Sequence, residues 1–189
     1  MPASPHRSDT IVVMGVSGVG KTTVADGIVA ATGWDFAEGD DFHPEANVAK
    51  MRAGTPLDDE DRWPWLRALA AWIGEQEQRG RSSVVACSAL KRSYRDLLSE
   101  GNPSVRFCAL EAGNGKLQER VDHREGHFMP PALLRSQLDT YEPLGPDEPG
   151  ARVNADGSEA SVIARVLDAL DLPAAAGGGA SPGVGDPTR

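Results

Sequence analysis

Short apolar runs alternate along the chain with longer segments whose apolar residues recur at helical spacing. The short runs predict strands at 10–14, 34–38, 83–87, 105–110 and, more weakly, 151–154. Helical spacing predicts helices at 23–31, 44–53, 61–79, 91–99, 114–124, 131–140 and 158–170. Strands that alternate with helices form parallel βαβ units with right-handed crossovers. The pattern therefore predicts an α/β fold with a five-stranded, mostly parallel sheet and helices on both faces.

The two ends of the chain lack this pattern. Residues 1–9 are polar and contain two prolines, and residues 173–189 are rich in glycine, alanine and proline. Such compositions bury too little apolar surface to form a core. We expect a flexible N-terminal arm at 1–9, one domain at 10–172 and a disordered tail at 173–189.

Composition narrows the range of partners. The 189 residues carry a formal net charge of −9, which disfavours nucleic acid and anionic membranes as partners. Cys87 and Cys108 lie in apolar runs and are expected to be reduced core thiols. No N-terminal stretch joins basic residues to a long apolar run, and no run approaches the ~18 apolar residues of a membrane span. We therefore expect a cytoplasmic protein.

The strongest chemical signal is Gly-Val-Ser-Gly-Val-Gly-Lys-Thr at 15–22, which fits the phosphate-loop pattern G-x-x-x-x-G-K-[ST]. It lies between a predicted strand and a predicted helix, so its backbone N–H groups would face an anion at a helix N-terminus. Lys21 is expected to reach the β- and γ-phosphates, and the Thr22 hydroxyl to bind Mg²⁺. The residues expected to contact the nucleotide are Gly15, Val16, Ser17, Gly18, Val19, Gly20, Lys21, Thr22 and Thr23.

Other sequence features separate the classes of phosphate-loop protein. A GTPase would show D-x-x-G after the second strand and a later N-K-x-D, but the D-x-x-G at 147–150 comes too late and N-K-x-D is absent. A motor ATPase would place a carboxylate after a long apolar strand, whereas the best such strand continues into Cys87 and Ser88. The remaining class is the small-molecule kinases.

A pair of carboxylates follows the second predicted strand, in Glu38-Gly39-Asp40. Residues two apart on a strand point to the same side, so both would face the phosphate loop. We expect Asp40 to accept a proton from a substrate hydroxyl and Glu38 to lie on the metal side. A solvated acidic turn is the alternative.

The segment at 58–66 predicts a helix start beside a cationic group. Asp58 is a typical N-cap, and Asp59, Glu60 and Asp61 suit the positive end of the helix dipole. Pro64 is then expected in the first turn, with Leu66, Leu69, Ala70 and Ile73 as the buried stripe. Arg62 is not explained in this way. Its fork of donors suits the carboxylate of an anionic substrate.

Two later segments add basic residues. Lys91, Arg92 and Arg95 follow the third strand, and Lys91, nearest the strand end, is the first candidate for binding an acidic substrate. The alternative is a solvated helix face. Arg120 and Arg124 share a helical face before Gly126 and two prolines, which predicts a mobile lid at about 112–131 that brings cationic charge to the transferring phosphoryl group.

These residues together make the chain resemble the bacterial-type gluconate kinases, a phosphate-loop family related to shikimate and adenylate kinases. The resemblance spans about 130 residues in the family's order. The matching stretches are 14–22, 38–40, 43–44 with Asn47, 50–51 with Gly54, 56–57, 61–62, 64–66, 87–91, 94–97, 126–128, 142–144 and 147–148. Cys-Ser-Ala-Leu-Lys at 87–91 and Gly-His-Phe-Met at 126–129 are specific to this family.

The resemblance implies a three-layer P-loop kinase fold with a mobile lid and ATP-dependent phosphorylation of D-gluconate to 6-phosphogluconate, which feeds the pentose phosphate pathway. It implies ATP and Mg²⁺ as cofactors and a homodimer. Asp40 would be the base, Arg120 and Arg124 lid arginines near ATP, and His43, Arg62, Lys91 and His127 substrate-binding residues. Two departures are Glu38, where an aspartate is expected, and Asp41, an additional acid.

Two other functions remain open from the residues. One is a kinase of another small acid or polyol, such as shikimate, which would share the phosphate loop and Asp40 but differ in the pocket formed by 42–66 and 88–95. The other is a regulatory nucleotide-binding module without turnover.

Overall fold

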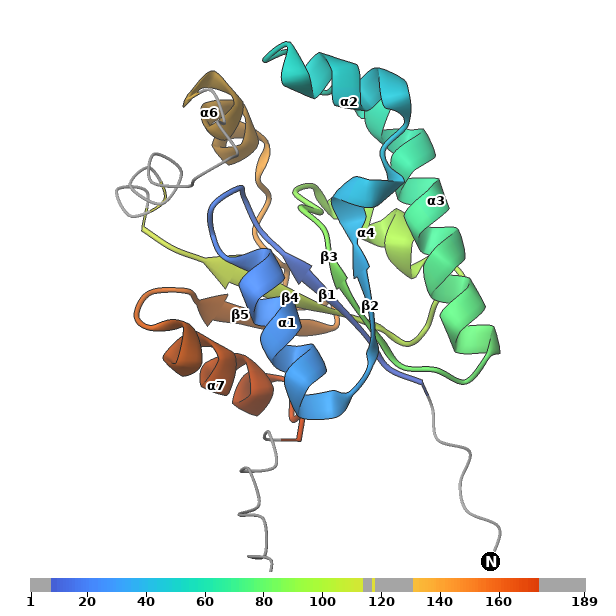
Figure 1. Cartoon of the computed structure of the whole chain (residues 1–189), viewed down its shortest axis with the longest axis vertical. Coiled ribbons are helices and arrows are strands. Elements are labelled where there is room, and N and C mark those ends of the chain that lie inside the picture. The colour runs from blue at the N-terminus through green and yellow to red at the C-terminus, as the bar shows by residue number, and fades with distance from the viewer. Residues whose placement is uncertain (1–7, 114–116, 118–130, 174–189) are drawn as a thin grey trace, which may run out of the picture.

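The computed structural model describes residues 8–113, 117 and 131–173 of the chain (Figure 1). Within these residues the strands are β1 (Thr10–Met14), β2 (Asp35–Glu38), β3 (Ser83–Ala86), β4 (Val105–Glu111) and β5 (Gly150–Asn154). The helices are α1 (Lys21–Thr32), the 3₁₀ helix η1 (Gly39–Phe42), α2 (Glu45–Arg52), α3 (Asp59–Gln78), α4 (Arg92–Ser99), α6 (Pro131–Thr140) and α7 (Glu159–Ala169).

The strands form one parallel sheet in the order β2-β3-β1-β4-β5. The chain adds strands first on one side of β1 and then on the other, so the order changes direction at the central strand. Ligands of parallel α/β sheets bind at such a point, beyond the carboxyl ends of the strands. Figure 1 shows α2 and α6 beyond this edge of the sheet.

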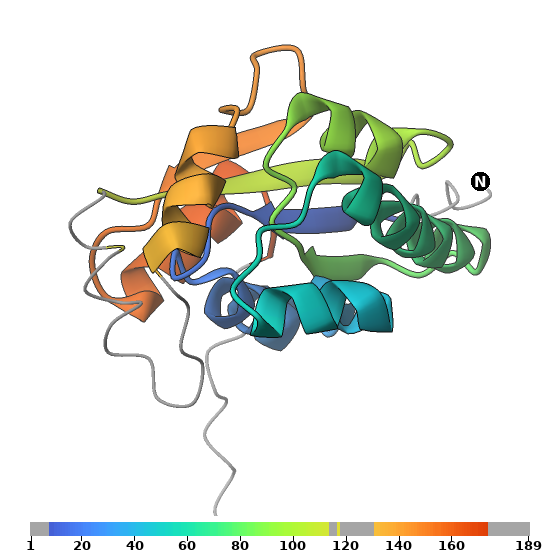
Figure 2. The same ribbon diagram turned by 90° about the horizontal axis from the view of Figure 1, so that it is seen from above.

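Helices cover both faces of the sheet and make a three-layer fold, as predicted (Figure 2). Ile11 and Val13 of β1 belong to a buried cluster with side chains of α1 and α7. Val12 and Met14 belong to a second cluster with side chains of α3 and α4. All five β1 residues are buried, because a central parallel strand has helices on both of its faces.

The start of α3 differs in one detail from the expectation. Asp58 is the N-cap: it accepts a hydrogen bond from the Asp61 amide, and the Asp61 side chain accepts one from the Asp58 amide. This reciprocal box starts the helix at Asp59, so Pro64 lies in the second turn, and its predicted place in the first turn is wrong. Pro64 leaves the Glu60 carbonyl without its usual helical donor. The predicted buried face of α3 is confirmed: Leu66, Leu69 and Ile73 are fully buried, and Ala70 is partly buried.

The remaining boundaries agree closely with the sequence pattern. The 3₁₀ helix η1 was not predicted, and the predicted helix at 114–124 lies, apart from Leu117, outside the described residues. Cys87 and Cys108 are free and buried, and burial raises the pKa of each thiol to about 12. Among the helices that the structure describes, none combines the length and apolarity needed to cross a membrane.

Candidate functional site

The phosphate loop connects β1 to α1 at the carboxyl edge of the sheet. Gly15 has φ +141°, and a Cβ there would lie 2.8 Å from the Leu110 carbonyl oxygen of β4, so a side chain would displace the loop. Gly20 has φ 104° and is the N-cap of α1 without a capping side chain. The first turn of α1 contains no acidic residue. The loop therefore combines backbone N–H groups with the positive end of a helix dipole, which is suited to phosphate.

The lysine and threonine of the loop already contact polar groups. The Lys21 ammonium donates to the Val16 carbonyl across 3.2 Å. The Thr22 hydroxyl donates to Glu38 Oε2 across 2.9 Å. Burial raises the pKa of Glu38, and the nearby charge of Asp40 acts in the same direction. A partly buried carboxylate that costs free energy to ionise is suited to a site where a cation binds beside it.

The oxygen atoms of Thr22 and Glu38 fit Mg²⁺. Magnesium is usually held by one or two carboxylates, water and the phosphates of the nucleotide rather than by a complete cage of side chains. In the described part of the chain no group of three His, Cys, Asp or Glu side chains forms such a cage. The donor set present is therefore the one expected for a metal that arrives with a nucleotide.

Asp40 does not lie on the strand, contrary to the geometry used to place it. The strand β2 ends at Glu38, and Gly39 begins η1, so strand alternation does not relate the two carboxylates. The Asp40 side chain is 80% exposed, and its carboxylate lies 3.8 Å from His43 Nε2. It remains close enough to Glu38 for its charge to raise the pKa of that residue.

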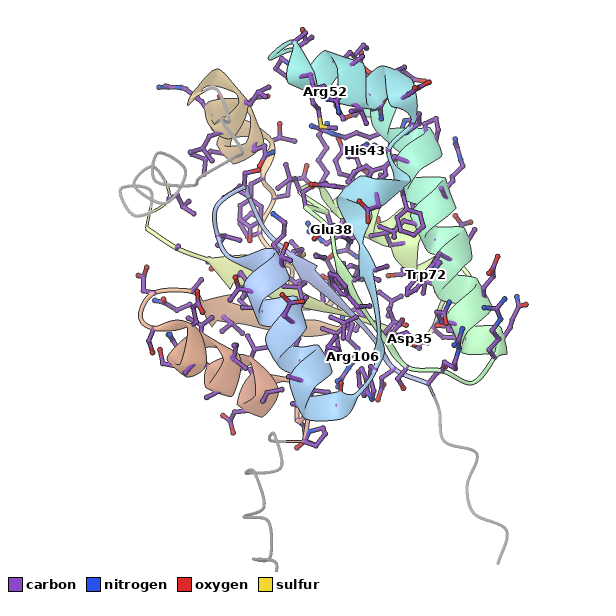
Figure 3. All side chains as sticks on the ribbon, viewed as in Figure 1. Asp35, Glu38, His43, Arg52, Trp72 and Arg106 are labelled. Carbon is purple, nitrogen blue, oxygen red and sulfur yellow. The ribbon has the colours of Figure 1, made fainter. Side chains whose placement is uncertain are left out.

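Contacts with neighbouring side chains hold His43, which is labelled in Figure 3. Its side chain is 4% exposed. The ring stacks on Trp65 with centroids 4.1 Å apart, and Nδ1 lies 3.2 Å from the amide nitrogen of Asn47. Burial lowers the pKa of His43, while the charge of Asp40 raises it and that of Arg62 lowers it. The charges of Asp40 and Arg62 thus both reach this imidazole.

Trp65 of α3 contacts both His43 and the 3₁₀ helix η1. Its indole N–H donates to the Gly39 carbonyl across 2.7 Å, and its side chain is 2% exposed. Trp65 is therefore a core residue, whereas Trp63 is only partly buried and meets the Tyr94 ring edge to face.

Arg62 and Lys91 come together around Tyr94. Arg62 donates to the Tyr94 hydroxyl across 2.9 Å, and that hydroxyl donates to Asp59 across 2.5 Å. Lys91 donates to both oxygens of Asp59 across 2.8 and 3.0 Å. Hydrogen bonds from Lys91 and then from Tyr94 lower the pKa of Asp59. Its ion pair with Lys91 shows a role for Asp59 that the helix-dipole interpretation missed.

A pocket opens beside this network. It has a volume of about 480 Å³ and is lined by Leu57, Asp58, Asp59, Glu60, Arg62, Lys91 and Thr140. Two cations on the wall suit an anionic small molecule, and the carboxylates offer acceptors for hydroxyl groups. We name this the acid pocket.

The other two basic residues of the 91–95 segment do not line the acid pocket. Arg95 is 1% exposed and forms a buried ion pair with Glu148, with N–O distances of 2.6 and 2.9 Å. It also donates to the carbonyls of Ala89 and Glu142. Arg92 pairs with Asp147 at the surface. Lys91 is therefore the one of the three that faces the pocket.

A second, smaller pocket lies at the ends of β4 and β5. Its volume is about 220 Å³, and it is lined by Glu111, Ala112, Gly113, Arg152, Asn154 and Asp156. Glu111 pairs with Arg152 and accepts a hydrogen bond from the Tyr141 hydroxyl. Arg152 and Asn154 of this lining belong to β5, and Asp156 lies in the loop that follows it. Arg120, Arg124 and His127, assigned to the lid, lie outside the described residues.

A phosphate loop at the carboxyl edge of a parallel sheet, with Arg62 and Lys91 in the wall of a nearby pocket, is typical of a P-loop kinase of small molecules. Residues 11–144 match the family described as an AAA domain. The chain is 51% identical to the gluconokinase of Gluconobacter oxydans over 146 residues, which cover 77% of this chain and 82% of that protein.

Two solved structures agree with this match. A sugar kinase from Janibacter sp. is 50% identical and has a TM-score of 0.83, covering 87% of this chain and 95% of that one. A gluconokinase from Sinorhizobium meliloti is 44% identical and has a TM-score of 0.77, covering 89% and 94%. The chain therefore belongs to the gluconokinase family.

Proposed function

We propose that this protein transfers the γ-phosphoryl group of ATP to a hydroxyl of D-gluconate and forms 6-phospho-D-gluconate. The observation that carries the proposal is the acid pocket, in which Arg62 and Lys91 flank Tyr94 on the sheet edge that bears the phosphate loop. A sugar acid offers one carboxylate for these cations and several hydroxyls for the carboxylates nearby.

Each residue of the proposed site has a separate role in the phosphoryl transfer. The phosphate loop and Lys21 hold the triphosphate and balance its charge. Thr22 and Glu38 would hold Mg²⁺, which neutralises charge on the phosphate oxygens when bound. Arg62 and Lys91 hold the carboxylate of the acid and direct its far hydroxyl toward the loop. Asp40 accepts the proton of that hydroxyl as the phosphoryl group transfers, with His43 beside it.

The lid residues complete the scheme as proposals. Arg120 and Arg124 would add positive charge around the transferring phosphoryl group, and His127 would contact the acid. The second pocket, at the ends of β4 and β5, is the site we propose for the adenine base. On the family resemblance we also propose that the protein is a homodimer and that it is cytoplasmic. Sedimentation velocity tests the homodimer, and cell fractionation tests the location.

The test of substrate is a panel assay of the purified protein with MgATP. Gluconate, shikimate, glycerate, glucose and nucleoside monophosphates are compared by ADP release and by detection of the phosphorylated product. Turnover confined to gluconate is the expected result. Turnover on another acid alone would retain the kinase and reject gluconate, and ATP binding without any turnover would favour a regulatory module.

The role of Arg62 is tested by Arg62→Ala. Loss of a charged hydrogen bond to a carboxylate costs about 2–3 kcal/mol, so KM for gluconate should rise about thirtyfold or more. KM for ATP should stay within about threefold, because Arg62 lies at the acid pocket. Arg67→Ala, at an exposed position on the same helix, is the matched control and should change neither constant. Equal rises in both KM values for Arg62→Ala would reject the role.

A further inference from the structure

Gln137 of α6 makes a direct contact with the phosphate loop that the mechanism above does not use. Its side-chain oxygen Oε1 accepts the Ser17 backbone N–H across 2.7 Å, over 120 positions of sequence. A backbone N–H can only donate, so the acceptor must be the amide oxygen, and the chemistry fixes the orientation of the Gln137 amide.

This contact holds one end of a peptide unit whose other end is held by Lys21. The Val16 carbonyl and the Ser17 N–H belong to the same planar peptide. The carbonyl accepts from the Lys21 ammonium across 3.2 Å, and the N–H donates to Gln137. Rotation of this peptide would break both contacts, so Gln137 helps to set the loop conformation in which Lys21 faces the nucleotide.

The same helix reaches the acid pocket one turn later. Thr140 follows Gln137 by three positions, which places the two on neighbouring points of the helix surface, and Thr140 lines the acid pocket. The helix is packed in the core through Leu134, which is 2% exposed. Side chains at both functional regions are therefore carried by one short, packed element.

The chain just after α6 is tied to the loop that carries Lys91. The Glu142 amide donates to the Leu90 carbonyl across 2.8 Å, and the Arg92 amide donates to Glu142 Oε2 across 2.7 Å. The Tyr141 hydroxyl donates to Glu111, which lines the second pocket. A shift of α6 would thus change the positions of residues in the phosphate loop and in both pockets.

We propose that Gln137 is a positioning residue that couples nucleotide binding to acid binding. Gln137 holds the Val16–Ser17 peptide and so fixes the position of the phosphate loop relative to the acid pocket. Binding of either ligand then stabilises the arrangement of the two sites that the other ligand requires. This inference rests on the proposed function, because it takes gluconate as the ligand of the acid pocket.

The test is a binding cycle by isothermal titration calorimetry. The Kd of gluconate is measured alone and at saturating ADP, for wild type and for Gln137→Leu, which keeps the size of the side chain but has no acceptor. Coupling between two sites is typically about 5–150-fold, and we expect a wild-type factor in this range. In Gln137→Leu the coupling factor should fall to within about twofold of unity.

Two further measurements separate positioning from simple destabilisation. Gln78→Leu, the same change at the exposed last residue of α3, should keep the wild-type coupling factor. In the ligand-free protein, the Ser17 amide should exchange its hydrogen faster in Gln137→Leu than in wild type, because its acceptor is gone.

Several outcomes would overturn the inference. They are a wild type without coupling, a Gln137→Leu variant that keeps it, and a variant in which the unfolding temperature and both separate affinities fall together. A wild type that binds ADP but not gluconate contradicts the proposed substrate instead. The cycle is then run with the acid that gives turnover in the panel, and the absence of any acid ligand would overturn both proposals.

Discussion

At the scale of single residues, the two cations of the acid pocket are not equivalent. Lys91 is bonded to both oxygens of the Asp59 carboxylate, whereas Arg62 donates to the neutral hydroxyl of Tyr94. An incoming carboxylate must compete with Asp59 for Lys91 but only with a phenol for Arg62. Lys91 and Asp59 attract each other as opposite charges, whereas Tyr94 offers Arg62 no negative charge. Arg62 is therefore the better placed of the two to bind the acid.

Glu38, which we propose to help hold Mg²⁺, carries a charge that burial disfavours. Glu38→Gln retains an oxygen acceptor for the Thr22 hydroxyl but has no charge to desolvate. We expect the ligand-free variant to melt roughly 1–3 °C above wild type at pH 8, a small gain because the side chain is only partly buried. Its Mg²⁺-dependent kcat should fall at least about tenfold.

The pH dependence of the folding stability tests the direction of this effect. The folded-state pKa of Glu38 lies above the ordinary value of 4.5, so the folded state binds more protons between the two values. Wild-type stability is therefore lost as the pH rises through the folded-state pKa. The difference in melting temperature between Glu38→Gln and wild type should grow from pH 4 to pH 8 in thermal melts. Glu45→Gln, at an exposed position on α2, is the control. A difference that shrinks with pH would contradict this account.

At the scale of elements, α4 is joined to the 142–150 segment by a buried ion pair. Arg95 and Glu148 are 1% and 9% exposed. Arg95 also donates to two carbonyl groups of the loop at 89–91 and to the carbonyls of Glu142 and Pro143. Ala89 in that loop has φ 41°, an uncommon backbone for a residue with a side chain. The pair therefore holds the loop that presents Lys91.

Breaking this pair should destabilise the domain strongly. Arg95→Met leaves Glu148 buried without its partner, a change that typically costs about 3–5 kcal/mol. Arg92→Met removes a neighbouring, exposed arginine that pairs with Asp147 at the surface and lies 3.8 Å from Glu148 Oε2, and should cost about 1 kcal/mol or less. Urea unfolding of both variants measures the difference. Similar losses for the two would show that burial of the Arg95–Glu148 pair is not what stabilises the segment.

The elements also show what the sequence can and cannot reveal. The ends of the strands were predicted within one residue, because buried runs such as 10–14 are apolar and rich in β-branched residues. The capping of α3 by Asp58 was predicted because capping is local. The Arg95–Glu148 pair spans 53 positions and the Lys91–Asp59 pair 32, so each depends on tertiary packing that no short motif encodes. The 3₁₀ helix η1 is held by the Trp65 indole from 26 positions away.

At the scale of the whole molecule, one sheet edge gathers the parts of the site. The phosphate loop follows β1, Glu38 ends β2, the 87–91 segment follows β3 and the second pocket adjoins β4 and β5. Direct contacts connect these parts: the Gly15 amide donates to the Ser88 carbonyl, and α6 reaches the phosphate loop through Gln137. The motifs of the sequence predicted the edge, and apolar spacing predicted the helix at 131–140. The contact of that helix with the phosphate loop came only from the structure.

The contacts made by the residues after α7 indicate where the folded domain ends. The last turns after α7 still contribute to the core: Leu170 is 3% exposed, and Leu172 packs against the same cluster as α1 and β1. The Leu170 carbonyl also accepts a hydrogen bond from Arg106 of β4 (Figure 3). The predicted tail at 173–189 begins directly after these contacts.

Two truncated chains test this boundary. A chain that ends at Leu172 should keep the melting temperature of the full chain within about 1 °C and its kinase activity, since every core contact described above is retained. A chain that ends at Asp168 loses Leu170, Leu172 and the acceptor of Arg106. Removal of a buried leucine costs about 2–5 kcal/mol, which corresponds to a fall of roughly 4–20 °C in a domain of this size. Equal melting temperatures for the two truncated chains would place the end of the core before α7 finishes. A large loss in the longer one would instead assign a stabilising role to the tail.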